Sequence, residues 1–563
     1  MTDLGDASAD GIDRRAFVTR SLIAGVLVTL PVACTPDAGP ADATAGSAAP
    51  TDGTLPVAPG VPAADDLFEL AVSAARELME KGTLTSRALT QRYLTRIDAM
   101  DKRGPAVNAV IELNPDALAI ADAMDAERKA GTVRGPLHGI PVLIKDNIDT
   151  GDKMRTTAGS LALASSTPLQ DAFIVERLRA AGAVLLGKTN LSEWANFRSS
   201  RSSSGWSGRG GQTRNPYVLD RNPCGSSSGT GAALTSDFAT IGIGTETDGS
   251  ILCPAALNGL VGLKPTVGLW GRSGIIPISA SQDTAGPMTR TVADAAALLT
   301  ALVGLDPRDS ATAQHAISAE LDYTRSLDPA GLQGARIGVA RNLAGFHPDV
   351  DKALDAAVAA LKAAGATIVD PADLAGVGKF GDAEFDVLLY EFKDGLNRYL
   401  ASLGPSAPIR SLAELIAYNE KEAAREMPWF GQETLIAAEK KGPLAEPAYL
   451  AARAKCIRLA RTEGLDATIA KHSLDAIVFP SNSPAWLTDH LNGDHFVGGD
   501  TSFAAVAGYP AVTVPMGSVH ELPVGLTFTG RAWSEAALLK YAYAFEQQTK
   551  ARRGPKYLVT LEV

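Results

Sequence analysis

Two clusters of serine and glycine lie between Asn222 and Cys253, and these residue types suit the hydrolysis of an amide or ester. The first cluster, residues 225–229, contains only glycine and serine. The second, residues 244–250, follows an apolar segment at 238–243 that predicts a buried strand. A strand that ends in a glycine-containing turn can aim several backbone N–H groups at one point. Such groups can hold an oxyanion while a serine of the same turn attacks the carbonyl carbon.

A serine nucleophile needs a base, and none of the seven histidines stands in a motif that would place it beside these serines. The other suitable base is a lysine that burial keeps uncharged. Lys145 directly follows the apolar segment 140–144, which predicts a buried strand. Asp146 comes next in the chain, and we expect its carboxylate to point away from the lysine, because successive strand residues face opposite sides of a sheet.

Lys145, the 225–229 cluster and the turn that ends at Ser250 together resemble the amidase signature family of serine amide hydrolases, over roughly residues 65–550. The resemblance implies a Ser–cisSer–Lys triad. In this triad Ser250 is the nucleophile, Ser226 passes on its proton and Lys145 is the terminal base. It also implies that Ser227 forms a hydrogen bond with the lysine.

The turn before Ser250 supplies the candidates for an oxyanion hole, which are the backbone N–H groups of Thr247, Asp248 and Gly249 together with that of Ser250 itself. Hydrolysis by such a triad requires no cofactor and no metal ion. His490 and His495 lie five residues apart without an evident third ligand, so we interpret them as surface histidines.

Two departures from the commoner family pattern resemble its peptide amidase branch, which removes the C-terminal amide of peptides. Cys224 precedes the first cluster in place of a glycine, and Asp248 interrupts the paired glycines that usually precede the nucleophile. The segment Ile275–Met288 adds to this likeness. The alternatives are an amidase for aryl or aliphatic amides, a glutaminase component of an amidotransferase, or a lipoprotein that binds amides without hydrolysing them.

The family resemblance implies one large α/β domain over residues 63–563, with a mixed β-sheet covered by helices on both faces. Alternating helical and strand patterns independently indicate an α/β fold. These patterns predict helices at 65–80, from Thr85 to Met100, at 117–130, at 171–182 and at 534–548, and strands at 183–186, 474–480, 511–515 and 523–529. Residues 300–470 are expected to be mostly helical and, by the resemblance, to cover the site.

The first residues read as a targeting segment. Arg14 and Arg15 precede an apolar run at 21–33, which matches a twin-arginine signal peptide over residues 1–33. Cys34 follows it as the candidate for lipidation. Residues 34–62, rich in Ala, Asp, Gly and Pro, predict a flexible tether. We therefore expect an exported protein that meets the membrane only through an N-terminal lipid anchor.

Charge and cysteine content bound the remaining possibilities. The net charge of −11 argues against nucleic acid as a partner, which leaves a peptide amide or another small amide as the expected ligand. Four cysteines are too few for a disulfide framework. Cys224 and Cys253 flank the two clusters, and the usual burial of free cysteine favours two small buried thiols over a bridge.

Overall fold

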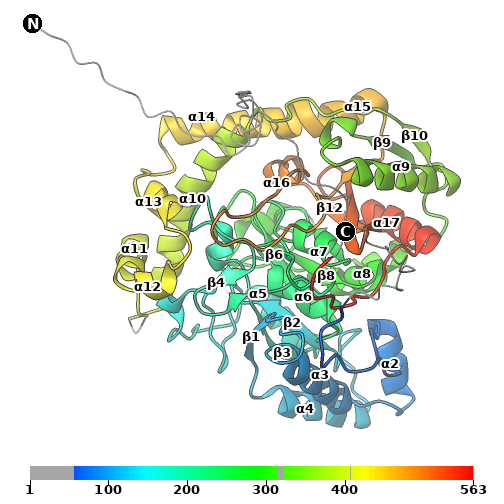
Figure 1. Ribbon diagram of the computed structural model, residues 1–563, viewed down its shortest axis with the longest axis vertical. Coiled ribbons are helices and arrows are strands. Elements are labelled where there is room, and N and C mark those ends of the chain that lie inside the picture. The colour runs from blue at the N-terminus through cyan, green and yellow to red at the C-terminus, as the bar shows by residue number, and fades with distance from the viewer. Residues whose placement is uncertain (1–55, 315–320, 406, 562–563) are drawn as a thin grey trace, which may run out of the picture.

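The computed structural model describes residues 56–314, 321–405 and 407–561. In this part of the chain, eleven strands form one mixed sheet in the order β1-β3-β2-β6-β8-β7-β12-β13-β11-β9-β10 (Figure 1). The sheet strands are β1 (Val110–Leu113), β2 (Pro141–Lys145), β3 (Val184–Thr189), β6 (Ile241–Glu246), β7 (Val261–Lys264), β8 (Thr284–Thr289), β9 (Arg336–Val339), β10 (Thr367–Val369), β11 (Ala476–Pro480), β12 (Ala511–Val519) and β13 (Leu522–Thr529). A separate two-stranded ribbon pairs β4 (Trp206–Ser207) with β5 (Gly211–Gln212).

The two strands that carry the candidate residues are parallel neighbours. β2 pairs with β6 on one side, where Ile144 is opposite Ile243, and with β3 on the other, where Lys145 is opposite Thr189. β6 continues into antiparallel pairing with β8. This arrangement brings the ends of β2 and β6 to the same edge of the sheet, where their side chains can meet.

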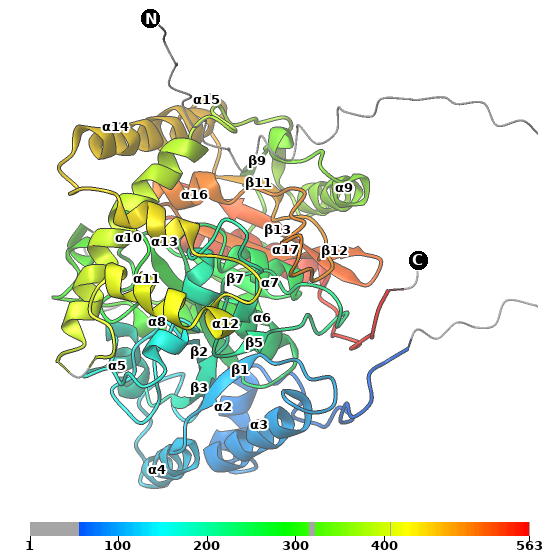
Figure 2. The ribbon, with the colours of Figure 1, turned by 60° about the vertical axis from the view of Figure 1, so that its left-hand side comes forward.

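Helices surround this sheet and follow it along most of the chain. They are α2 (Val72–Glu80), α3 (Ser86–Met100), α4 (Ala117–Lys129), α5 (Phe173–Ala180), α6 (Ser228–Thr235), α7 (Leu252–Leu257), α8 (Val292–Leu302), α9 (Pro348–Ala363), α10 (Gly381–Ser402), α11 (Leu412–Lys421), α12 (Ala423–Glu426), α13 (Glu433–Glu439), α14 (Pro447–Cys456), α15 (Ala467–His472), α16 (Ser502–Ala507) and α17 (Glu535–Thr549). Figure 2 shows α10 to α14 gathered on one side of the molecule.

Strand β13 shows that helices cover both faces of the sheet. A Cβ atom on Gly525 would lie 2.9 Å from Ala256 of α7, so the absence of a side chain lets α7 approach closely. The ring of Phe528, three residues later, lies 6.0 Å from Phe545 of α17. Residues three apart in a strand face opposite sides, so α7 and α17 lie on opposite faces. The predicted α/β/α architecture is confirmed.

Most of the predicted elements are present, with differences at their ends. Thr85 accepts a hydrogen bond from the N–H of Ala88 and so caps α3, as the sequence predicts. Helix α2, in contrast, begins at Val72, because residues 66–69 form turns. The strand predicted at 238–243 lies three residues further along, as β6. The largely helical region 300–470 also contributes β9 and β10 to one edge of the sheet.

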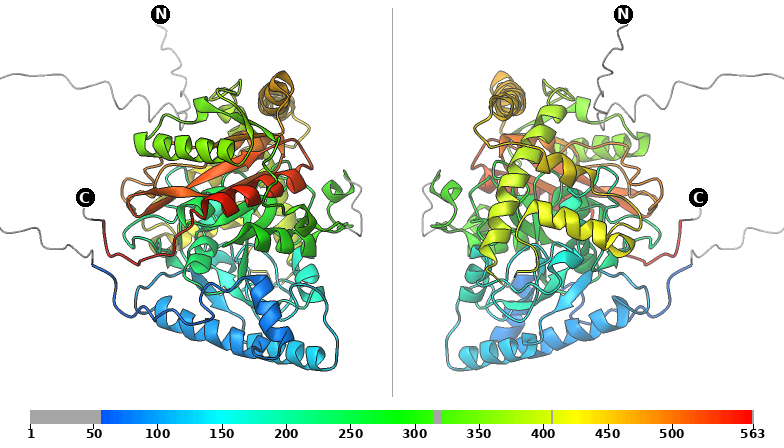
Figure 3. Two further views of the ribbon diagram at one scale, coloured as in Figure 1. Left: turned by 90° about the vertical axis from the view of Figure 1, so that its right-hand side faces the viewer. Right: turned by 90° about the vertical axis from the view of Figure 1, so that its left-hand side faces the viewer.

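The first and last described residues lie side by side (Figure 3). Val57 pairs with Leu558, and the N–H of Ala58 donates to the carbonyl of Tyr557 at 2.9 Å. Ordered contacts therefore begin before position 63, where the predicted tether ends. Arg14, Arg15 and Cys34 lie outside the described residues. No helix in the described part of the chain is long and apolar enough to cross a membrane.

A disulfide bond joins Cys224 to Cys253, so the expectation of two free thiols is wrong. The Cα atoms lie 6.0 Å apart, within the range for a disulfide. Both cysteines belong to a buried apolar cluster with Trp486 and Leu558. The usual burial of free cysteine could not reveal this pair, because only the folded chain brings the two residues together.

The bridge closes a loop of 29 residues around both serine clusters. By loop entropy, such a bridge stabilises the folded state by about 3 to 4 kcal/mol. We expect the Cys224→Ser/Cys253→Ser variant to unfold at a clearly lower urea concentration than the oxidised wild type. Reductant should shift the wild type to the variant's midpoint and leave the variant unmoved. Equal midpoints for wild type and variant would contradict the prediction.

Candidate active site

Lys145 is the last residue of β2, and its side chain is completely buried. Its Nζ atom lies 2.8 Å from Ser226 Oγ, 2.9 Å from Thr245 Oγ1 and 3.1 Å from the carbonyl oxygen of Thr245. Three polar atoms therefore surround the amine, and none of them carries a charge. The two candidate residues Lys145 and Ser226 are in direct contact, as the sequence analysis expected.

Burial controls the protonation of this lysine. Because desolvation penalises the ammonium form, it lowers the pKa of Lys145 to about 7, although the carboxylates of Glu246 and Asp283 oppose the shift. The neighbouring Asp146 takes no part, since its carboxylate accepts from the hydroxyl of Thr157 and lies 3.4 Å from Arg209. The expectation that Asp146 faces away from the lysine is confirmed.

Ser226 occupies the tight connection that leads into α6. The peptide bond between Gly225 and Ser226 is cis, and the Ser226 carbonyl accepts from the N–H of Ser192 at 3.1 Å. A Cβ atom on Gly225 would lie 2.2 Å from Ser192 Oγ, so only glycine fits before Ser226. The local sequence thus permits a backbone path that presents the Ser226 hydroxyl to Lys145.

Ser250 lies on the turn after β6, next to the first serine cluster. Its carbonyl accepts from the N–H of Ser227 at 3.2 Å. It is 8% exposed, whereas Ser226 and Lys145 are fully buried, so of the three it is the side chain nearest to solvent. On the far side of the turn, Glu246 Oε2 accepts from the N–H groups of Ile251 and Leu252 at 2.7 and 2.9 Å.

The three candidate residues of the oxyanion hole lie on this same turn. Thr247 Oγ1 donates to Asp283 at 2.6 Å. The Asp248 carboxylate accepts from Thr501 at 2.5 Å and from Ser502 at 2.6 Å. Gly249 has a φ angle of +77°, which glycine adopts without strain. Side chains on both sides of the turn thus fix its backbone N–H groups in space.

Ser227 does not contact the lysine, which corrects the role expected for it. Its hydroxyl donates to the carbonyl of Thr245 at 3.1 Å and accepts from the N–H of the same residue at 3.2 Å. It therefore acts on Lys145 through Thr245. Thr245 and Asn147, whose Nδ2 donates to Thr245 Oγ1 at 3.0 Å, are site residues that the sequence analysis missed. The available signal was their position, two residues after Lys145 and inside the second serine cluster.

A cavity of about 190 Å³ adjoins the site on the side of Asn147, Thr245 and Thr247. Its other wall consists of residues from two loops, Arg272–Thr284 and Arg308–Asp309. Within residues 56–314, 321–405 and 407–561, no group of three or more His, Cys, Asp or Glu side chains could hold a metal ion. His490 instead stacks on the ring of Trp429 at 5.0 Å.

Comparison with known proteins gives one consistent result. The Amidase family model matches residues 88–539. A probable amidase of Arabidopsis thaliana is 42% identical over 500 residues, which is 87% of this chain and 92% of that protein. The amidase-like component of the glutamyl-tRNA(Gln) amidotransferase of Moorella thermoacetica is 34% identical over 500 residues, covering 87% of this chain and 98% of that component.

Among solved structures, the native peptide amidase from Stenotrophomonas maltophilia is 54% identical, with a TM-score of 0.83. The match covers 87% of this chain and 99% of that one. The family model alone spans well over half of the sequence, and it includes both serine clusters and Lys145. The chain therefore belongs to the amidase family, the amidase signature enzymes that hydrolyse carbon–nitrogen amide bonds.

Proposed function

We propose that this amidase is exported and removes the C-terminal carboxamide of peptides, using Ser250, Ser226 and Lys145 as its catalytic triad. The observation that carries the triad is the 2.8 Å contact between a fully buried, weakly basic Lys145 and Ser226. The substrate class is supported by the 54% identity to a peptide amidase over nearly its whole length. Asp248 and Cys224, the two departures from the commoner pattern, favour the same branch.

The contacts of Lys145 define the direction of proton transfer. A neutral amine has two N–H donors and one lone pair. The two Thr245 oxygens take the two donors, so the lone pair is left to accept the hydroxyl proton of Ser226. Ser226 is then ready to accept the proton of Ser250 as this residue attacks. The resulting ammonium of Lys145 holds the proton until the leaving group needs it.

In the first half of the reaction, Ser250 Oγ forms a bond to the amide carbon, and its proton passes through Ser226 to Lys145. The oxyanion accepts hydrogen bonds from the N–H groups of the 247–250 turn. The C–N bond then breaks, and the same proton returns through Ser226 to the nitrogen, which leaves as ammonia. In the second half, water gives its proton to the relay and attacks the Ser250 ester. The peptide acid leaves, and Ser250 recovers its proton.

Export is supported by the sequence and by the disulfide bond. Arg14 and Arg15 precede an apolar segment of signal-peptide length, and Cys34 follows it as the candidate for lipidation. A structural disulfide such as Cys224–Cys253 persists in oxidising compartments and is rare in the cytosol. We therefore place the enzyme in the cell envelope, held to the membrane through a lipid on Cys34.

One relative supports a second candidate function. The 34% identity to a component of an amidotransferase is compatible with a glutaminase that supplies ammonia to a partner. Such a role belongs in the cytosol, and the twin arginines and the disulfide bond argue against it. Amidases for aryl or aliphatic amides remain the alternatives within the family. Binding of amides without turnover would require a defective triad, whereas Lys145, Ser226 and Ser250 are all present.

Substrate choice is tested by ammonia release from matched compounds. We expect kcat/KM to be at least about tenfold higher for peptide C-terminal amides than for simple aliphatic or aryl amides, because the peptide part adds binding energy in the transition state. Ser250→Ala should lose more than about 1000-fold in rate with an unchanged melting temperature. Ammonia from free glutamine but not from peptide amides would favour the amidotransferase function instead.

The lysine relay is tested by the pH dependence of kcat/KM, measured from acidic through neutral to alkaline pH. Only uncharged Lys145 can accept a proton, and its pKa is about 7, so activity should rise as pH increases through neutrality and then level off. Lys145→Ala and Ser226→Ala should both be severely impaired, and the double variant should lose little more than the worse single one. Additive losses, or a flat wild-type profile, would contradict the relay.

Export is tested by fractionation of cells that produce the full chain. Replacing Arg14 and Arg15 with lysine should leave the precursor in the cytoplasm, while Arg20→Lys serves as the matched control and should be exported. Cys34→Ala should release a membrane-bound protein into the soluble fraction or block its cleavage. A Cys34→Ala protein distributed like the wild type would exclude the lipid anchor without excluding export.

A further inference from the structure

Asp283 holds the nucleophile turn to a neighbouring loop. It directly precedes β8, and one of its carboxylate oxygens accepts from the hydroxyl of Thr247 at 2.6 Å. The other oxygen accepts from the N–H groups of Ile278 and Ser279 at 2.9 and 2.8 Å. One carboxylate thus joins the candidate oxyanion turn to the loop 278–283, which we call the strap.

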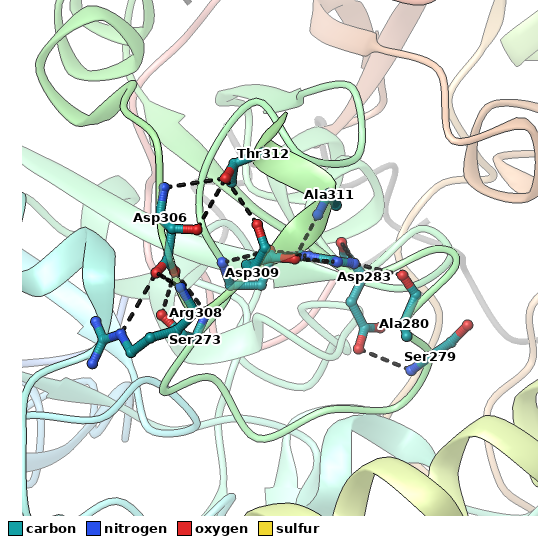
Figure 4. A network of polar contacts seen from close by, with 10 residues as sticks. Ser273, Ser279, Ala280, Asp283, Asp306, Arg308, Asp309, Ala311 and Thr312 are labelled. Carbon is teal, nitrogen blue, oxygen red and sulfur yellow. Dashed lines mark hydrogen bonds and ion pairs between the residues drawn. The ribbon is translucent and has the colours of Figure 1, made fainter. Parts of the chain in front are cut away.

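The strap is itself fixed on the side away from the turn. Arg272 Nη1 donates to the carbonyl oxygens of Ala280 at 2.6 Å and of Asp283 at 3.4 Å. The same guanidinium makes a two-pronged ion pair with Asp309, at 2.7 and 2.8 Å. Figure 4 shows Asp283, Ser279 and Ala280 at one end of this polar network, with Asp306 and Asp309 at the other. The strap is therefore anchored independently of the turn that it holds.

Helix α10 contacts the strap through two buried acidic side chains. Glu391 accepts from the hydroxyl of Ser279 at 2.6 Å and from the N–H of Ser281 at 2.9 Å. Gln282 Nε2 donates to Glu384 at 3.0 Å and to the Thr247 carbonyl at 3.3 Å. Thr247 is thus held twice by the strap, through its side chain by Asp283 and through its backbone by Gln282.

Asp283 also lies across the cavity from the residues that hold Lys145. The cavity is lined by Thr245 and Thr247 on one side and by Asp283 on the other. Two carboxylates, Glu246 and Asp283, raise the pKa of Lys145 against the effect of burial. Arg272 is the cation that faces Asp283, and burial raises the pKa of the Asp283 carboxyl to about 6. Asp283 is therefore mainly charged at the pH at which Lys145 titrates.

We propose that Asp283 is a positioning residue for the hydrolysis, which fixes the oxyanion turn through Thr247 and supplies a negative charge to the surroundings of Lys145. This inference rests on the proposed triad. The two effects use different properties of the carboxylate. Holding the strap and the turn requires acceptors on both oxygens, because the donors are one hydroxyl and two N–H groups. The effect on Lys145 requires only the charge.

Asp283→Asn removes both properties, because an amide group offers one acceptor oxygen and carries no charge. We expect kcat to fall roughly 10- to 100-fold, the scale of a misplaced catalytic group. The pH at which Lys145 loses its proton should also move downward, by about half a unit or more, because a neighbouring negative charge favours the ammonium. A purely structural role would leave this pH unchanged.

The protonation of Lys145 can be followed without activity, by NMR of enzyme that carries ¹³C-labelled lysine, with the resonance identified by its absence from Lys145→Ala. Asp283→Glu keeps the charge and should leave the titration near that of the wild type. Glu391→Gln is the matched control, since it removes a carboxylate from the same network that does not act on Lys145. It should leave the titration unmoved.

Thr247→Val removes only the hydroxyl that Asp283 accepts from, so it tests the mechanical role even where Asp283→Asn folds poorly. It should lower kcat without moving the Lys145 titration, and its effect should not add to that of Asp283→Asn. An unmoved titration in Asp283→Asn, or additive losses with Thr247→Val, would overturn the proposal. Failure of the triad is recognised separately, because Ser250→Ala or Ser226→Ala would then remain active.

Discussion

The centre of this molecule depends on the burial of one lysine. Moving an ammonium group out of water costs several kcal/mol unless charged partners compensate, and the three atoms around Lys145 Nζ are uncharged oxygens. The lysine therefore lowers the free energy of the fold most when it gives up its proton. A residue that is ordinarily a surface cation becomes a base near neutral pH, and the fold must supply the site that keeps it dry.

The parallel pair β2 and β6 meets this requirement. Apolar side chains occupy β2 up to Ile144, and the register with β6 places Thr245 where its oxygens reach the amine. Ser227, at the start of α6, holds both the N–H and the carbonyl of Thr245. A Cβ atom on Gly244 would lie 2.8 Å from Ser227 Oγ, so glycine at this position lets α6 lie close to the strand. The glycines of the motif thus serve the lysine as well as the serines.

The sequence predicts those parts of the structure that depend on local pattern. The apolar run before Lys145, the Thr85 cap and the glycine-rich turns all act over a few residues, and the structure contains them. The disulfide, the contact of Ser227 with Thr245 and the strap depend on register and on loops that meet only after folding. Asp283 lies 33 residues beyond Ser250, and no periodic pattern connects the two. Such contacts require the three-dimensional arrangement.

The aspartate before Gly249 shows how the helical cover is joined to the chemistry. Asp248 stands where the commoner pattern has glycine, and it accepts hydrogen bonds from Thr501 and Ser502 at the start of α16. It is also hydrogen-bonded to Glu384 of α10, whose pKa is raised well above the usual range by burial and by the neighbouring carboxylate.

A raised pKa means that Glu384 keeps its proton, and only a protonated carboxyl group can donate to a carboxylate. Glycine at position 248 would leave α10 and α16 without this shared partner. Together with the strap, the Asp248 contacts attach the turn that carries Ser250 to α10 at two separate points. A change in α10 that alters which substrates fit must therefore also act on the position of the oxyanion turn, so specificity and rate are mechanically linked in this enzyme.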